Sequence, residues 1–241
     1  MAEWNIEYIA ETDSTNRWLK DWAAAEAGNH KELIEKVVVA DYQTAGRGCG
    51  TNHWESERGK NLIFSILLHP HGVPAQKQFH ISMAISLAIC KALGQHIGDL
   101  SIKWPNDIYW RNGKIGGILI EVTLLGNKVK DCIIGIGLNV NQRVFRSDAP
   151  NPVSMWQICE QETDCGQLLQ DILQAFEEYL DKPNKDEYQS MLYRRKGFHP
   201  YADKNGAFMA EIVDVEDDGH LLLRDDNGQQ RRYAFKEVTF V

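Results

Sequence analysis

Four short β-type segments follow one another between residues 100 and 139, and this run constrains the fold more than any other feature. The segments cover residues 100–104, 108–110, 115–123 and 130–139. The second and third are joined by Arg111-Asn112-Gly113, and an Asn-Gly pair between β-type segments is typical of a hairpin turn. The centre of the chain is therefore predicted to be β-sheet.

Helical and β-type segments before and after this run predict an α+β fold. Residues 14–26 have a helical period, with Trp18, Leu19, Trp22 and Ala23 on one face. Further strands are predicted over 37–42 and 62–68, a buried helix over 79–97, and helices over 165–181 and 185–195. Together they predict a mixed sheet with helices over residues 1–190.

The C-terminal segment has a different pattern. From Ala207 onward apolar and polar residues alternate, with turn sequences at Asp218-Gly219 and Asn227-Gly228. This pattern is typical of a β-meander that forms a small barrel. A second, small β domain is therefore predicted over residues 191–241.

The charge and cysteine content narrow the range of partners and compartments. The 241 residues carry 26 basic and 34 acidic side chains, a formal net charge of −8. Binding nucleic acid through its phosphates requires a basic face, so that class is disfavoured, whereas a small anionic ligand needs only a few local cations. No apolar run approaches the roughly 20 residues of a membrane span, and the N-terminus does not read as a targeting signal. Five cysteines without a Cys-x-x-Cys pair predict a reducing cytoplasm.

Two short segments combine cations with turn-forming residues. Gly46-Arg47-Gly48-Cys49-Gly50 follows a predicted strand, so its backbone N–H groups and the Arg47 guanidinium suit a carboxylate or phosphate. An ordinary flexible hairpin is the alternative. Lys103-Trp104-Pro105-Asn106-Asp107 holds a lysine among apolar neighbours, where an ammonium suits an oxygen that gains charge. The alternative is a structural ion pair of Lys103 with Asp107 or another acid.

Glycines interrupt two of the central strands, at Gly116-Gly117 and at Gly135 and Gly137. Glycine inside a strand marks either the close approach of another group or a β-bulge. The spacing does not separate these two interpretations.

In their order and wording, these segments closely resemble biotin protein ligases from about residue 12 to residue 141. Lys103-Trp104-Pro105-Asn106-Asp107 is the most specific of them. The other matching segments are Asp13-Ser14-Thr15-Asn16, Gln43-Thr44-Ala45-Gly46-Arg47-Gly48, Trp54, Gly59-Lys60-Asn61-Leu62, Lys114–Glu121 and Gly135–Asn141. The resemblance implies a catalytic domain of the class II aminoacyl-tRNA synthetase type shared by biotin and lipoate ligases, followed by an SH3-like barrel.

The resemblance also implies a two-step reaction. Biotin and ATP, with Mg²⁺, give biotinyl-5′-AMP and pyrophosphate, and a lysine of the biotin carboxyl carrier domain of a carboxylase then takes the biotinyl group. Lys103 and Arg47 would be the catalytic residues, because two anions must be brought together in the first step. The resemblance assigns no metal ligands and no nucleic-acid or membrane partner, and it is compatible with a homodimer.

The binding residues follow from the same match. Those implied for biotin are Ser14, Thr15, Asn16, Gln43, Gly46, Arg47, Gly48, Lys103, Gly116, Gly117, Gly135 and Gly137. Those implied for the nucleotide are Arg47, Gly48, Cys49, Trp54, Lys103, Asn106 and Asn139. Ser14 and Thr15 can also cap the next helix, and both roles are compatible.

Two features depart from the family pattern. Cys49 and Asn52 stand where relatives often carry arginine. We therefore hypothesise that the adenylate is held less tightly, with Cys49 as a neutral wall; a thiol activated by Arg47 is the alternative. Because only thirteen residues precede Ser14, a monofunctional ligase without an N-terminal DNA-binding domain is expected. Competing interpretations are a lipoate ligase or octanoyltransferase and a catalytically silent biotin-binding protein.

Overall fold

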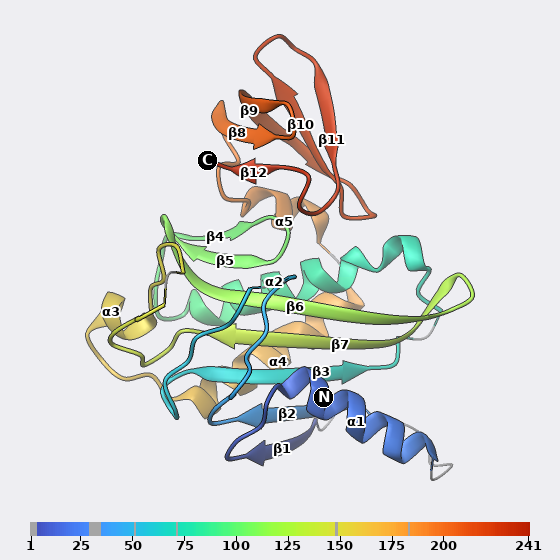
Figure 1. The fold of residues 1–241 in the computed structure, drawn as a ribbon, viewed down its shortest axis with the longest axis vertical. Helices are drawn as coiled ribbons and strands as arrows, with labels where there is room; N and C mark the ends of the chain where they lie inside the picture. The colour runs from blue at the N-terminus through green and yellow to red at the C-terminus, as the bar shows by residue number, and fades with distance from the viewer. Residues whose placement is uncertain (1–3, 29–34, 51, 71, 148, 183) are drawn as a thin grey trace.

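The computed structural model describes residues 4–28, 35–50, 52–70, 72–147, 149–182 and 184–241 (Figure 1). Its centre is a seven-stranded sheet with the strand order β1-β2-β3-β7-β6-β5-β4. β1 and β2 pair in parallel and the other neighbours are antiparallel, which confirms the predicted mixed sheet. The strands are β1 (Asn5–Ile9), β2 (Lys36–Ala40), β3 (Leu62–Leu68), β4 (Leu100–Lys103), β5 (Asp107–Trp110), β6 (Gly113–Leu125) and β7 (Lys128–Leu138).

The predicted β5–β6 hairpin is confirmed, and the long β6–β7 pair brings the strand glycines together. Arg111 adopts a left-handed φ of 49° in the hairpin turn. In the β6–β7 ladder Gly117 lies opposite Gly137, and Leu119 lies opposite Gly135. Gly117, Gly135 and Gly137 therefore form a glycine strip in the middle of the sheet.

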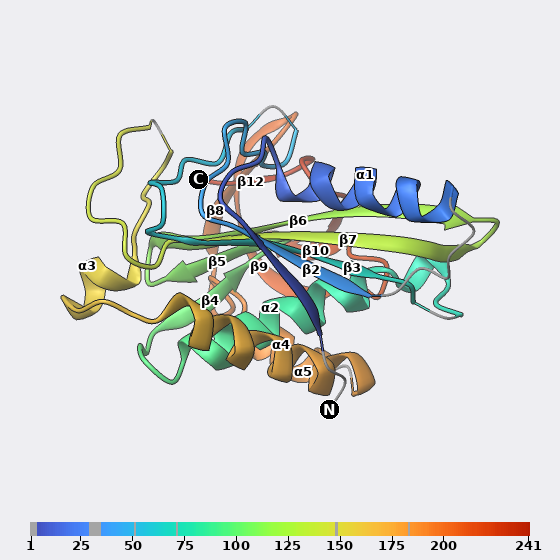
Figure 2. The same ribbon diagram turned by 90° about the horizontal axis from the view of Figure 1, so that it is seen from below.

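Helices cover both faces of this sheet (Figure 2). α1 (Thr15–Gly28) lies on one face, and α2 (Phe79–Leu93) and α4 (Cys165–Asp181) lie together on the other. Leu19 of α1 is fully buried against the sheet, as its place on the apolar face predicted. None of the described helices is long and apolar enough to cross a membrane.

Several element boundaries differ from those predicted. α5 (Lys185–Ser190) ends at Ser190 rather than at 195, with Met191 as its C-cap, and the left-handed φ of 61° at Arg194 would not fit a right-handed helix that ran to 195. α2 ends at Leu93 rather than at 97. The sequence reasoning missed β1, the 3₁₀ helix η1 (Ala75–Lys77) and α3 (Met155–Cys159).

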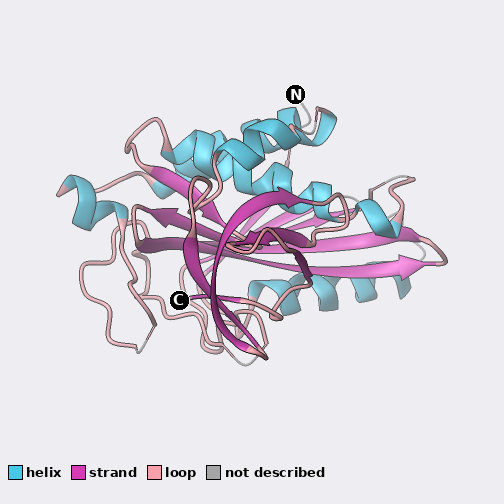
Figure 3. Cartoon of the chain, turned by 90° about the horizontal axis from the view of Figure 1, so that it is seen from above, coloured by secondary structure: helices cyan, strands magenta, loops and turns pink. Residues whose placement is uncertain are grey.

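A second, five-stranded antiparallel sheet lies beyond β4 and confirms the predicted C-terminal β domain (Figures 1 and 3). Its strands are β8 (His199–Asp203), β9 (Gly206–Val215), β10 (Leu221–Asp225), β11 (Gln230–Tyr233) and β12 (Thr239–Phe240), in the order β11-β10-β9-β8-β12. β8 begins before Ala207, where the alternation was predicted to start. Across the seam between the sheets, Trp104 Nε1 donates to the carbonyl of Gly219 over 2.9 Å. The division at residue 190 stays a prediction.

Candidate active site

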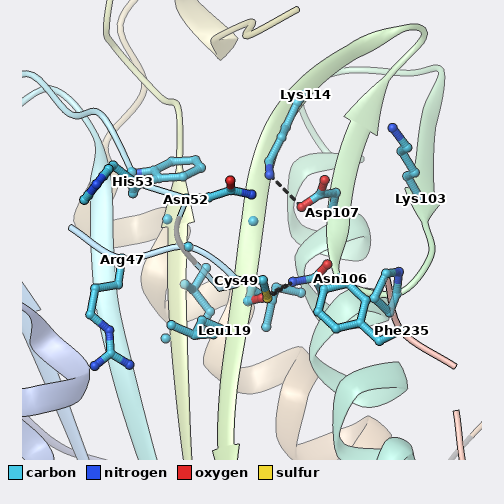
Figure 4. A pocket seen from close by; sticks show the side chains of 18 of the residues that line it. Arg47, Cys49, Asn52, His53, Lys103, Asn106, Asp107, Lys114, Leu119 and Phe235 are labelled. Carbon is cyan, nitrogen blue, oxygen red and sulfur yellow. Dashed lines mark hydrogen bonds and ion pairs between the residues drawn. The ribbon is translucent and has the colours of Figure 1, made fainter. Parts of the chain in front are cut away.

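A cavity of about 420 Å³ lies between the larger sheet, the segment 43–54 and residues 235–240 of the second sheet (Figure 4). Most of the site residues predicted from sequence line it. They are Ser14, Thr15, Asn16, Gln43, Arg47, Gly48, Cys49, Trp54, Lys103, Asn106, Gly117, Gly135 and Gly137. The fold thus gathers residues more than 120 positions apart around one space, and their ligand-binding roles stay predictions.

One end of the cavity is built from amides and hydroxyls at the start of α1. The backbone N–H and the hydroxyl of Thr15 both donate to Gln43 Oε1, over 2.8 and 3.0 Å. Ser65 Oγ, fully buried on β3, lies 2.7 Å from both Thr15 Oγ1 and Asn16 Oδ1. Because these contacts fix the carbonyl end of Gln43, its NH₂ group is oriented as a donor.

The close approach of another side chain, the first of the two interpretations, explains Gly135 and Gly137. A Cβ at Gly135 would overlap the Asn16 side chain, with Asn16 Cγ only 3.0 Å away. A Cβ at Gly137 would lie 2.8 Å from Trp54 Nε1, so the indole rests directly on the strand. β7 pairs with β6 without a register shift at Gly135 or Gly137, so a bulge does not explain these two glycines, whereas the shift between β5 and β6 lies next to Gly116.

Arg47 is held by an acid beside the polar end. Its Nη2 lies 2.6 Å from Glu121 Oε1, and Asn16 Nδ2 donates to Glu121 Oε2 over 2.7 Å. Burial by itself would raise the pKa of Glu121, but the hydrogen bonds from Asn16 and Arg47 and the charge of Arg47 outweigh it and lower the pKa. The Glu121 carboxylate therefore neutralises part of the charge of Arg47.

Lys114 is the lysine that pairs with Asp107. Its Nζ lies 2.6 Å from Asp107 Oδ1, and Figure 4 shows this pair at the wall of the cavity. A Cβ at Gly117 would lie 3.3 Å from the same Nζ, so the ammonium lies against the glycine strip. Sequence reasoning did not select Lys114 as a site residue.

Lys103 has aromatic rather than acidic neighbours. Its Nζ donates to the hydroxyl of Tyr109 over 3.0 Å and lies 5.4 Å from the ring centre of Phe240. Within the described part of the chain no carboxylate oxygen lies within 4.0 Å of it, so the alternative of a structural ion pair is not borne out. Burial lowers the pKa of Lys103, and the charge of Asp107 only partly offsets this.

Cys49 forms part of the cavity wall, as hypothesised. Asn106 Nδ2 lies 3.1 Å from Cys49 Sγ and 2.6 Å from the carbonyl of Ile118. Burial raises the pKa of the Cys49 thiol, so the alternative of a thiol activated by Arg47 is wrong for this arrangement.

Three residues predicted for binding do not line the cavity. Gly46 lies against the backbone carbonyl of Trp54, and Gly116 against Leu138. Asn139 is 3% exposed, and its Nδ2 donates to the carbonyl of Val153 over 3.1 Å, which holds a loop behind the sheet. Lining residues that sequence reasoning missed include Lys114, Asp107, Phe235 and Lys236; the first two stand inside the matching segments, whereas no sequence signal marks the last two.

Known proteins share this fold and sequence pattern. The pattern of the family described as "Biotin/lipoate A/B protein ligase family" matches residues 8–139. The bifunctional ligase/repressor BirA of Bacillus subtilis is 32% identical over 235 residues, which cover 88% of this chain and 68% of that protein. The biotin–[acetyl-CoA-carboxylase] ligase of Paracoccus denitrificans is 29% identical over 243 residues, 92% of this chain and 95% of that one. The biotin protein ligase of Aquifex aeolicus, solved with biotin and ATP, superposes with a TM-score of 0.79 at 26% identity over 98% of each chain.

Proposed function

Because the chain belongs to the biotin/lipoate A/B protein ligase family, we propose that it activates biotin with ATP and transfers it to a lysine of a carboxylase carrier domain. The observation that carries this proposal is a cavity that joins an end of amides and hydroxyls, with Arg47 beside it, to an end lined by lysines. Such a cavity suits a ligand with a neutral polar head and an anionic tail.

The polar end suits the ureido ring of biotin, which offers two N–H donors and one carbonyl acceptor. The oriented NH₂ group of Gln43 is a donor for the carbonyl. The hydroxyl of Ser14, which is 4% exposed and makes no hydrogen bond within the described residues, is free to bond a ring N–H. The glycines let the side chains of Asn16 and Trp54 lie directly on the strands, and the cavity beside these side chains is open for the bicyclic ring.

The cationic end suits the first chemical step. A biotin carboxylate oxygen attacks the α-phosphorus of ATP, the bond from that phosphorus to the bridging oxygen breaks, and pyrophosphate leaves with the electron pair. Lys114, Lys103 and Arg47 offset the repulsion between the two anions, because fixed positive charges act more strongly in a partly enclosed cavity than in bulk water. Nothing on the enzyme is covalently modified.

The second step uses the same cations. The neutral amine of the carrier lysine attacks the biotinyl carbonyl, AMP leaves with the electron pair, and the amide nitrogen loses a proton to solvent. Lysine ammonium groups beside the mixed anhydride stabilise the oxyanion that forms at that carbonyl.

Mg²⁺ would enter this site with the nucleotide. Among the described lining residues Asp107 is the one carboxylate, and it is engaged by Lys114. This donor set fits a Mg²⁺ ion held mainly by phosphate oxygens and water, because Mg²⁺ commonly keeps several waters and uses one or two carboxylates. When bound, the ion would neutralise charge on the leaving pyrophosphate.

A free edge of β6 is the surface we assign to the carrier domain. β5 pairs with β6 only as far as Gly117, so residues 119–125 have no strand partner on that side within the described chain. Leu124 and Leu125 there are 50% and 71% exposed. A strand of another chain can pair with such an edge, and a homodimer would use the same surface.

All five cysteines are free thiols, which fits a reaction in the cytoplasm.

Two assays test the proposal. Exchange of labelled pyrophosphate into ATP is expected to require biotin and not lipoate, which separates this function from lipoate ligation. Incubation with ATP, biotin and a carrier domain should give a streptavidin-reactive band that is lost when the acceptor lysine of the carrier is replaced. Lys114→Gln should abolish the band, and Lys204→Gln, in the exposed β8–β9 turn, should leave it unchanged. A wild-type chain that binds biotin but gives neither signal would be a silent binding protein.

A further inference from the structure

The second sheet contributes a lysine to the wall of the cavity. Phe235 and Lys236 lie in the turn that precedes β12, and both line the cavity. The turn is fixed by two contacts: the N–H of Ala234 donates to Glu237 Oε2 over 2.8 Å, and the N–H of Glu237 donates to the carbonyl of Ala234 over 3.1 Å. Its geometry therefore holds Lys236 at a defined place above the larger sheet.

The side chain of Lys236 reaches from this turn to the glycine segment 46–50. A Cβ placed on Gly50 would overlap Lys236 Nζ and would lie 3.4 Å from its Cε. The positive charge also acts on Cys49, where it opposes the rise in the pKa of the thiol caused by burial. The ammonium thus stands beside a segment whose own side chains at 49 and 52 are neutral.

Lys236, like Lys103, differs in its partners from Arg47 and Lys114. Arg47 is paired with Glu121, and Lys114 is paired with Asp107. Over the described residues, no carboxylate oxygen lies within 4.0 Å of Lys236 Nζ, whose closest aromatic neighbour is its own adjacent ring, Phe235, at 5.6 Å. Its full charge is therefore free for an anionic ligand.

We propose that Lys236 is a nucleotide-binding residue supplied by the second sheet, whose ammonium binds a phosphate oxygen of ATP and then of the adenylate. The assignment rests on the proposed function, since it requires a nucleoside triphosphate in this cavity. This assignment makes the second sheet part of the ATP site. Lys236 would supply the positive charge that Cys49 and Asn52 lack. Biotin, whose polar head lies at the α1 end, does not need this charge.

The backbone at Lys236 provides a variant that removes the charge without harming the fold. Lys236 has a left-handed φ of 70°, a conformation that favours glycine. Lys236→Gly should therefore fold at least as well as the wild type, and thermal unfolding checks this. Lys236→Arg keeps the charge, and Lys204→Gln removes an exposed lysine of the same sheet outside the cavity.

The test compares ATP and biotin affinities. In calorimetric titrations with a non-hydrolysable ATP analogue, Lys236→Gly should raise the Kd about tenfold, the low end for a hydrogen bond between charged groups. Lys236→Arg should stay within about threefold of wild type, Lys204→Gln should match it, and the Kd for biotin should not change in any of them. Cys49→Arg in the Lys236→Gly background should recover part of the loss and slow the release of biotinyl-AMP.

Two results would overturn the assignment: an unchanged Kd for the ATP analogue in Lys236→Gly, or an equal loss of biotin affinity, which would indicate general damage to the cavity. The titration needs no turnover, so it measures nucleotide binding separately from catalysis. That function fails separately, if the wild-type chain catalyses no biotin-dependent pyrophosphate exchange.

Discussion

Gly135→Ala tests whether the glycine strip keeps the polar end of the cavity intact. The new methyl group would occupy the space of the Asn16 amide, whose Cγ and Nδ2 would lie only 3.0 and 3.2 Å from it. Asn16 is 3% exposed, and its amide is enclosed by the sheet. The amide must therefore move, and it cannot move without breaking its hydrogen bonds.

The cost follows from the bonds that Asn16 makes. Its amide bonds to Ser65 Oγ at 2.7 Å, to Glu121 Oε2 at 2.7 Å and to the carbonyl of Leu119 at 3.3 Å. A neutral bond contributes about 1 kcal/mol and a bond to a charged group about 1.5–3 kcal/mol, so losing the two short ones costs about 2.5–4 kcal/mol. The alanine variant regains about 0.4–1 kcal/mol of stability, because its unfolded chain has less conformational freedom than that of the wild type. The expected net loss in the free energy of unfolding is therefore about 2–3 kcal/mol.

Urea unfolding with a matched control measures this loss. Gly98→Ala is the control, because its new methyl group would meet no atom within 4 Å, so its stability should only rise, by about 0.4–1 kcal/mol. In the Asn16→Ala background, Gly135→Ala should cost far less, since the overlapping amide is gone. Biotin titration should show a loss of affinity in Gly135→Ala alone. Equal stability and equal biotin affinity for Gly135→Ala and Gly98→Ala would refute the role given to the glycine.

Two further predictions concern pH. Burial lowers the pKa of Lys103 below its ordinary 10.5, so the rate of adenylate formation should begin to fall at a lower alkaline pH than it would with an ordinary lysine. Lys103→Arg should move this alkaline limb of the pH–rate profile to higher pH. Identical alkaline limbs in the two proteins would show that the charge of Lys103 is not used. The folded-state pKa of Glu121 is lowered from 4.5, so its stabilising effect is present above pH 4.5 and is lost as the pH falls through the folded value. Glu121→Gln should flatten the acid side of the stability profile measured by thermal unfolding, and an unchanged profile would contradict the assigned contacts.

The sheet, the hairpin and the C-terminal β domain could be predicted because their signals are local. The Asn-Gly turn and the alternation after Ala207 depend only on neighbouring residues. β1 escaped prediction because it is a half-exposed edge strand of five residues, without a continuous apolar run. The end of α5 at Ser190 was not predicted because neither glycine nor proline follows it directly in the sequence.

Which of Lys103 and Lys114 pairs with Asp107 could not be predicted from the sequence, because the pairing depends on a β-bulge. Lys114 and Gly117 are three residues apart, so in a regular strand their side chains would lie on opposite faces. The β5–β6 register shifts after Ile108: Ile108 pairs with Gly116 and Tyr109 with Lys114, which leaves Ile115 unpaired. The bulge places Lys114 on the face that carries Asp107 and the glycine strip. The regular alternation of a strand would instead predict that the Lys114 side chain faces away from the site.

The distribution of charge supports the proposed role of the second sheet in nucleotide binding. Arg47 and Lys114 come from the larger sheet and its loop, and each is already paired with a carboxylate. The two lining lysines without an acid partner in the described chain lie at the seam: Lys103 beside Phe240 of β12, and Lys236 in the turn before β12. A ligand with several negative charges is therefore drawn to the seam, where it contacts both sheets at once. A nucleotide that contacts both Lys103 and Lys236 is therefore expected to stabilise the folded chain against thermal unfolding.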